Sequence, residues 1–283
     1  MTCSICNKKG HNKRSCKKTT QVSESKIKAP DAKPDAKPDV KAKPDAKADV
    51  KEIPPVKVYM ALQTEDTGKM FEMAICLAYG ISYDGKYKYS MEIPEKLKLR
   101  LSKLIDIFPM CRHTAKKGSR YDYTSLTDET MHLSAKSTKK GMGKVAPQVI
   151  GQSQPKKFCE TIGIEYTTIS DLKKHIQTKI VEIIPILVNY TFDCPTIYYN
   201  HDKNTIRYIT LSTPIEWNEY KFKWTCGWSE WSNSSTLKII IKEKEYALLE
   251  FQFHTKNRTN MAIRWCYENF LTIFKENLCI IDF

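Results

Sequence analysis

The chain has 283 residues, of which 41% are hydrophobic and 11% aromatic, and this composition suffices for one substantial hydrophobic core. Lysine and arginine total 46 against 32 acidic residues, so the formal charge of +14 favours a polyanionic partner such as nucleic acid. The sequence has no N-terminal apolar run and no stretch of about 20 apolar residues, which argues against secretion and membrane insertion and predicts an intracellular protein of the cytoplasm or nucleus.

Residues 1–18 carry a metal-binding pattern, Cys3-x2-Cys6-x4-His11-x4-Cys16. Three thiolates and one imidazole suit tetrahedral Zn²⁺, which would supply the folding energy that so short a segment lacks. The spacing, with Gly10 directly before His11, resembles the CCHC zinc knuckle of retroviral nucleocapsids. The resemblance implies nucleic-acid binding, which here would depend on basic side chains because no aromatic residue lies between the ligands: Lys8, Lys9, Lys13 and Arg14. The alternative is four unconnected residues in a disordered tail.

Residues 19–53 repeat Lys-Pro-Asp-Ala and close variants. Regular proline blocks helix and sheet, and the segment has almost no apolar side chains that could offset the entropy of ordering. We therefore expect a disordered spacer between the knuckle and a single folded domain at residues 54–283. Such a tether would keep nucleic acid concentrated near that domain.

The folded domain is expected to mix helices and strands. Apolar residues at helical spacing, together with proline and glycine boundaries, predict helices over 67–79, 95–107, 147–162, 169–188 and about 266–276. Alternating or β-branched runs predict strands over 121–127, 131–137, 196–199, 205–212, 221–225, 236–241 and 247–254. This order predicts an α/β fold with a mixed central sheet flanked by helices.

The first two predicted strands form a hairpin that brings together an acid and a base. With the turn centred between residues 128 and 129, Asp122 falls opposite Ala135, and one residue of slack pairs it with Ser134 or Lys136. Ser134 and Lys136 share a face because side chains alternate along a strand. A carboxylate and an ammonium that meet there can hold a divalent metal and steer an attacking water.

This hairpin resembles the PD-(D/E)XK nuclease superfamily, particularly its type II restriction endonucleases. The resemblance assigns Asp122 as a Mg²⁺ ligand, Lys136 as the active-site lysine, and Glu72 on the preceding helix as the helical acid. It also implies that Gln148 or Gln152 supplies the polar group of the following helix. Ser134 stands where the family has its second acid.

A plainer interpretation treats Asp122 as a solvated strand residue and Lys136 as part of a basic surface. Lys139, Lys140 and Lys144 continue that basic run, and they fit either interpretation because a nuclease must also neutralise phosphates.

A second polar cluster follows the strand predicted over 247–254. Glu250, Gln252 and His254 alternate with apolar neighbours and so line one face, and Asn257 and Arg258 come just after. We favour base or phosphate contact for Gln252, His254, Asn257 and Arg258, because such side chains read base edges. The alternatives are a polar sheet edge, or a metal-binding triplet that includes Glu250. The five tryptophans are expected mainly in the core, and the seven dispersed cysteines as reduced thiols.

The sequence therefore predicts a Mg²⁺-dependent DNA endonuclease of restriction type that acts on double-stranded DNA, with a zinc knuckle as an accessory nucleic-acid-binding module. A homodimer is possible for such an enzyme. One alternative is a noncatalytic nucleic-acid-binding protein with a nuclease-like fold. Another is a zinc-knuckle adaptor whose main domain binds protein, which would leave the basic clusters without a role.

Overall fold

The computed structural model describes residues 64–116, 119–229, 231–255 and 259–283. The predicted zinc knuckle and linker lie outside these residues, as do Asn257 and Arg258. The seven cysteines of the described ranges form no disulfide.

The first sheet has six strands in the order β1-β2-β3-β5-β6-β11. Strands β1 (Cys111–His113), β2 (Tyr123–Ser125) and β3 (His132–Thr138) form an antiparallel meander, and β5 (Thr196–Asn200) lies parallel to β3. The antiparallel strands β6 (Thr205–Leu211) and β11 (Leu278–Asp282) complete the sheet. Every residue of β5 is buried, as expected for a central strand that is covered on both faces.

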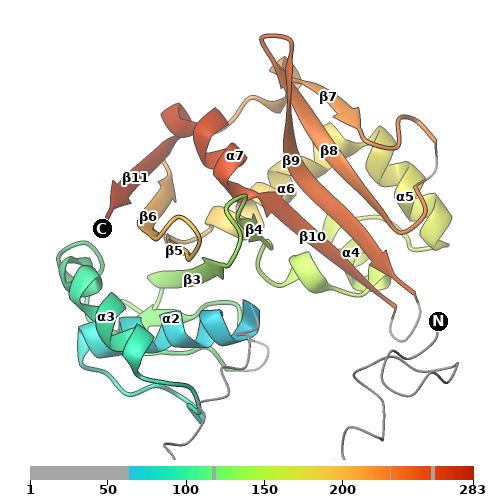
Figure 1. Cartoon of the computed structure of the whole chain (residues 1–283). Coiled ribbons are helices and arrows are strands. Elements are labelled where there is room, and N and C mark those ends of the chain that lie inside the picture. Colours follow the sequence, from blue (N-terminus) through green and yellow to red (C-terminus); the bar gives the residue numbers. More distant parts are fainter. Residues whose placement is uncertain (1–63, 117–118, 230, 256–258) are drawn as a thin grey trace, which may run out of the picture. The chain divides into compact units, whose positions relative to one another are not determined.

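Two helices pack on one face of this sheet (Figure 1). Helix α2 (Thr64–Tyr79) buries Met70, Phe71, Ala74 and Ile75, which recur at helical spacing, and Gly80 ends it with a left-handed φ of 63°. Helix α3 (Glu92–Leu101) follows and passes into the 3₁₀ turn η2 (Ser102–Asp106). The two helices share a core with β1, β2, β3, β5 and β6.

The second sheet has five antiparallel strands in the order β4-β10-β9-β8-β7. Its members are β4 (Lys144–Val145), β7 (Lys221–Trp224), β8 (Ser234–Ile241), β9 (Lys244–His254) and β10 (Asn260–Cys266). The chain therefore leaves the first sheet after β3, contributes β4 to the second sheet, and returns through helices to β5. This crossing places the end of β3 close to the second sheet.

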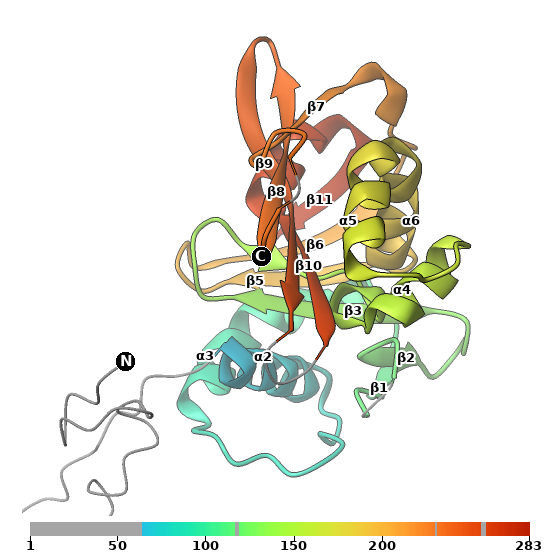
Figure 2. The ribbon, with the colours of Figure 1, turned by 90° about the vertical axis from the view of Figure 1, so that its right-hand side faces the viewer.

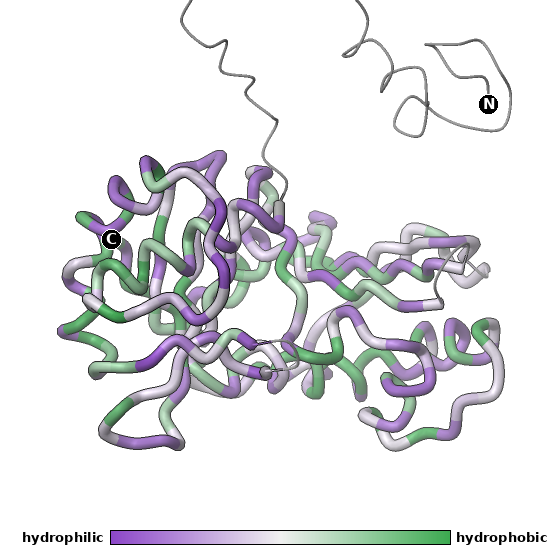
Figure 3. The backbone as a smooth tube through the Cα atoms, turned by 90° about the horizontal axis from the view of Figure 1, so that it is seen from below, coloured by the Kyte–Doolittle hydropathy of each residue, from purple (hydrophilic) through white to green (hydrophobic). Residues whose placement is uncertain are grey.

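Helices α4 (Pro155–Ile162), α5 (Ile169–Thr178) and α6 (Ile180–Phe192) make the return, preceded by the 3₁₀ turn η3 (Ile150–Gln152). They lie beside the second sheet (Figure 2) and share its core. The short helix α7 (Tyr267–Ile273) packs into that core as well, with the turns η4 (Trp217–Glu219) and η5 (Lys275–Asn277) flanking it. Figure 3 shows hydrophobic and hydrophilic residues interspersed along the backbone.

Tryptophans occupy this second core, as predicted, with one exception. Trp217, Trp224, Trp231 and Trp265 are buried, whereas Trp228 is 79% exposed.

The predicted mixed α/β architecture is confirmed, and several of its details are corrected. The strands form two sheets instead of one. The helix predicted over 147–162 begins only at Pro155, because a residue before proline disfavours helical angles and Gln154 is extended. The helix predicted over 169–188 is broken at Lys179, which lets two apolar faces pack on one core. The helix predicted over 266–276 is a shorter helix between the unpredicted strands β10 and β11.

Candidate active site

The hairpin of β2 and β3 brings Asp122 next to Ser134 and Lys136. Tyr123 pairs with Leu133, so the register places Asp122 opposite Ser134, one residue from the predicted centre and within the predicted slack. The Asp122 backbone N–H donates to the Leu133 carbonyl at 3.2 Å, which continues the ladder by one residue. Asp122 therefore sits where the pairing with β3 ends.

The two oxygens of the Asp122 carboxylate have different surroundings. Oδ2 accepts hydrogen bonds from the Ala135 backbone N–H at 2.7 Å and from the Ser134 hydroxyl at 3.1 Å. The Lys136 ammonium lies 3.9 Å from the same oxygen. Oδ1 has no hydrogen-bond or ion-pair partner among the described residues. Neutral donors thus fix the carboxylate and leave one oxygen available to a ligand.

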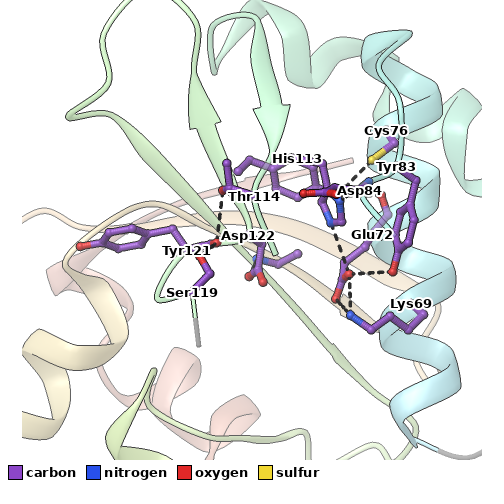
Figure 4. Close-up of polar contacts among 12 residues, drawn as sticks. Lys69, Glu72, Cys76, Tyr83, Asp84, His113, Thr114, Ser119, Tyr121 and Asp122 are labelled. Carbon is purple, nitrogen blue, oxygen red and sulfur yellow. Dashed lines mark hydrogen bonds and ion pairs between the residues drawn. The ribbon is translucent and has the colours of Figure 1, made fainter. Parts of the chain in front are cut away.

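Glu72 lies on α2, and its carboxylate belongs to a neighbouring cluster (Figure 4). Lys69 Nζ is 3.0 Å from Oε2, the Tyr83 hydroxyl donates to it at 3.3 Å, and His113 Nε2 is 3.4 Å away. Burial raises the pKa of Glu72, but the neighbouring His113 imidazole and Lys69 ammonium outweigh burial and hold the pKa below its usual value. Within the described part of the chain, no hydrogen bond or ion pair joins Glu72 to Asp122 or Lys136.

Asp193, which the sequence analysis missed, anchors the segment that carries Asp122. It follows the last residue of α6, and its Oδ2 lies 2.6 Å from Arg120 Nη2 and accepts a hydrogen bond from the Tyr121 hydroxyl at 2.7 Å. The Arg120 guanidinium also lies over the Tyr190 ring, 4.6 Å from its centroid. No local sequence signal points to this contact, because more than 70 positions of the chain separate Asp193 from Arg120 and Tyr121.

A cationic cleft of about 1050 Å³ opens beside Lys136. It lies between the end of β3, the 139–143 turn, β4, residues 146–149 and the second sheet. Its lining contains five cations and, within the described ranges, no carboxylate: Lys136, Lys139, Lys140, Lys144 and Arg264. The positive φ of Gly143 shapes the turn, and a Cβ at that position would overlap the Tyr198 hydroxyl. The cleft can hold a polyanion next to the Asp122 carboxylate.

Gln148 and Gln152 also line this cleft, although neither lies on the helix on which they were predicted. Gln148 precedes η3, is buried, and its Nε2 approaches Asp193 Oδ1 at 3.5 Å. Gln148 Oε1 is buried without a hydrogen-bond partner in the described structure. Gln152 is exposed at the end of η3. Gln148 therefore contacts Asp193, the residue that anchors the segment carrying Asp122.

The second polar cluster lies on β9 and β10. Glu250 is 2.8 Å from Lys144 Nζ and 3.0 Å from Arg264 Nη2, so cations approach both of its oxygens. Arg264 Nη2 also donates to Gln252 Oε1 at 2.6 Å. His254 is exposed at the end of β9. The polar face predicted for this strand is therefore real, but its acid is already neutralised.

The described residues contain no group of three or more His, Cys, Asp or Glu side chains placed to hold a metal. This finding does not bear on Cys3, Cys6, His11 and Cys16, which lie outside those residues.

No helix within the described ranges is long and apolar enough to cross a membrane. Burial and the neighbouring Asp193 charge raise the pKa of the Cys194 thiol to about 12.

Comparison with known proteins finds a relative among restriction enzymes. The chain is 41% identical over 219 residues to the type II restriction enzyme CviAII of Paramecium bursaria Chlorella virus 1. The aligned region is 76% of this chain and 62% of that enzyme, so the chain spans less than two thirds of the length of its relative. No family model and no solved structure matches the chain.

Proposed function

We propose that this protein is a Mg²⁺-dependent DNA endonuclease of restriction type. The observation that carries the proposal is the Asp122 carboxylate, which is fixed through one oxygen, open at the other, and 3.9 Å from the Lys136 ammonium at the edge of a cationic cleft. The similarity to a type II restriction enzyme supports the same activity.

The residues around Asp122 fit Mg²⁺, which prefers oxygen ligands and keeps several waters, so that one or two carboxylates suffice. Asp122 Oδ1 is one donor. The Ala135 carbonyl is a second, because the Ala135 N–H points to Asp122 and the N–H and C=O of one strand residue face the same edge. Ser134 is not an acid, and its hydroxyl holds Asp122 Oδ2. When bound, Mg²⁺ would neutralise phosphate charge and make a coordinated water more acidic.

Lys136 has the second role in the proposed reaction. Its ammonium donates hydrogen bonds to the water that attacks phosphorus and stabilises the negative charge that develops on the phosphate oxygens. Asp122 keeps this ammonium at the cleft edge, where the side chain is 24% exposed. Gln148 supplies an amide oxygen from the cleft wall, and Gln152 lies at its rim. Glu72 on α2 supports the hairpin through His113 of β1, the strand that pairs with β2.

Double-stranded DNA is the proposed substrate because the cleft wall is cationic. Lys139, Lys140 and Lys144 would neutralise phosphates of the bound duplex. The proposed accessory module remains the knuckle of residues 1–18, with Zn²⁺ held by Cys3, Cys6, His11 and Cys16, on the spacer of residues 19–53. We propose an intracellular enzyme that is able to act as a homodimer on a duplex.

A noncatalytic DNA-binding protein is the second candidate, and the serine at position 134 favours it because a nuclease of this type usually has an acid there. The test is to incubate the full chain with supercoiled plasmid in Mg²⁺ and, separately, in chelator. We expect linear or nicked DNA in Mg²⁺ alone. Lys136→Ala should lose cleavage and keep duplex binding measured in Ca²⁺. If the parent protein binds plasmid but cleaves none in Mg²⁺ or Mn²⁺, the noncatalytic candidate is correct.

A further inference from the structure

Arg264 is held in the cleft wall by two side chains of the neighbouring strand. Register pairs Arg264 on β10 with Glu250 on β9 and Ala262 with Gln252, so both acceptors lie on the same face as the arginine. Nη2 donates to Gln252 Oε1 at 2.6 Å and lies 3.0 Å from Glu250 Oε2. Within the described structure, Nη1 has no partner, and Nε is buried without one. Nη2 therefore makes one hydrogen bond, to Gln252, and Nη1 makes none, so both terminal nitrogens keep a donor for a ligand, whereas Nε is buried.

This environment suits base recognition better than phosphate neutralisation. Glu250, which is shared with Lys144, offsets part of the Arg264 charge, so a contact of Arg264 with a phosphate would release fewer counterions than a contact of a lysine without an ion pair. The hydrogen bond to Gln252 and the ion pair with Glu250 also restrict the plane of the guanidinium, and a restricted plane gives directional hydrogen bonds. Lys140 offers a contrast, because its ammonium is exposed at the cleft and makes no ion pair with another described residue. Lys140 suits a phosphate, and Arg264 suits an acceptor at a defined position.

We propose that Arg264 is a specificity-determining residue that recognises a guanine edge of DNA bound in the cleft. Arginine carries donors only, and guanine presents two adjacent acceptors, N7 and O6, in the major groove. Adenine and cytosine place amino donors at the equivalent edge and are rejected. Gln252 and Glu250 are positioning residues that orient Arg264. This inference rests on the proposed function, since it requires DNA in the cleft.

The first test selects duplexes from a randomised library by binding in Ca²⁺ and sequences the bound fraction. The parent should enrich a motif with guanine at one position, together with its symmetric partner if the protein is dimeric. Arg264→Lys keeps the charge but loses the planar fork, and it should reduce the guanine preference at that position by about tenfold while other positions keep theirs. Lys140→Ala is the matched control, and it should weaken binding to all sequences equally.

Gln252→Ala is a second variant, which separates loss of the Arg264 contact from misfolding. It keeps Arg264 and its ion pair with Glu250, and it removes only the hydrogen bond that orients the guanidinium. It should reduce the preference at the same position by less than Arg264→Lys does. Replacing that guanine by 7-deazaguanine removes the N7 acceptor and should weaken binding by the parent about tenfold. The same replacement should leave binding by Arg264→Lys unchanged.

The inference is overturned if Arg264→Lys keeps the guanine preference, if it behaves like Lys140→Ala at every position, or if the parent enriches no motif. These outcomes are separable from failure of the proposed function. A parent that enriches a motif through Arg264 but never cleaves DNA would retain the inference and lose the endonuclease. If the parent cleaves DNA and Arg264→Lys keeps the parent's sequence preference, the endonuclease is retained and the inference about Arg264 is lost.

Discussion

Asp122 on the first sheet and Glu250 on the second are both partly buried carboxylates beside cations, yet their oxygens are used differently. Neutral donors hold Asp122 Oδ2, the nearest ammonium is 3.9 Å away, and Oδ1 is without a partner in the described residues. Lys144 and Arg264 approach Glu250 to 2.8 and 3.0 Å. A carboxylate that is neutralised by two cations offers little to a metal ion. Residue type and strand position alone therefore do not identify the catalytic acid.

Parallel substitution of Asp122 and Glu250 tests which of the two carboxylates cleavage requires, and it should give the largest effect. Asp122→Asn should lower Mg²⁺-dependent cleavage on the order of 1000-fold or more, because it removes the proposed metal ligand. Glu250→Gln keeps an acceptor for Arg264 and should cost less than about tenfold. The measurement is single-turnover cleavage of a defined duplex at saturating enzyme. If Glu250→Gln is inert and Asp122→Asn active, the catalytic centre lies on the second sheet.

A third carboxylate, that of Glu72, extends the comparison to the pH dependence of folding stability. The pKa of Glu72 is held below its ordinary value of 4.5, so its ionised form stabilises the fold above that pH, and the stabilisation is lost as pH falls through the lowered pKa. Glu72→Gln should cost about 1 to 3 kcal/mol at pH 7, because buried donors lose a charged partner. Urea unfolding at pH 7 and pH 3 checks this. A pH-independent difference would contradict a structural carboxylate at position 72.

Asp193 tests whether the Asp122 oxygen needs a fixed position. Asp193→Asn weakens the hold on Arg120 and Tyr121 and should raise the Mg²⁺ concentration for half-maximal cleavage about tenfold. Cleavage at saturating Mg²⁺ and duplex binding without metal should change little. The matched control is Glu129→Gln, which breaks the exposed pair of Arg112 and Glu129. A lower melting temperature with an unchanged Mg²⁺ requirement would make Asp193 purely structural.

The smallest expected effect concerns the cleft between the two acids. Lys140→Ala should weaken duplex binding a few-fold and reduce the salt slope of log K by about 1, because one phosphate contact is lost. Lys96→Ala, on the helix that packs against the first sheet, removes the same charge outside the cleft lining and should leave the slope unchanged. Equal slopes for both variants would place the DNA elsewhere.

The hairpin was the most predictable part of the molecule, because its register depends on local pairing. A single turn fixed Asp122 opposite Ser134 to within one residue, and alternation then placed Lys136 on the same face. Helix α2 was equally accessible, since its apolar repeat and Gly80 are local signals.

Features that depend on distant partners could not be read from sequence. Asp193 meets Arg120 and Tyr121 across more than 70 positions of the chain, and Arg264 meets Gln252 only because β9 and β10 are neighbours. The division into two sheets was hidden for the same reason. Strand β4 joins the second sheet by pairing with β10, but it has only two residues. A strand of that length shows no periodic hydrophobic pattern in the sequence.

The closing strand of the first sheet has a consequence for how the protein folds. β11 covers the edge of β6, but all five strands of the second sheet lie before β11 in the chain, and four of them, β7 to β10, lie between β6 and β11. The pairing of Leu278 with Leu211 therefore closes a loop that contains most of the second core, and contacts of such separation form slowly. We expect the two sheets to unfold in one cooperative transition, with refolding limited by the docking of β11.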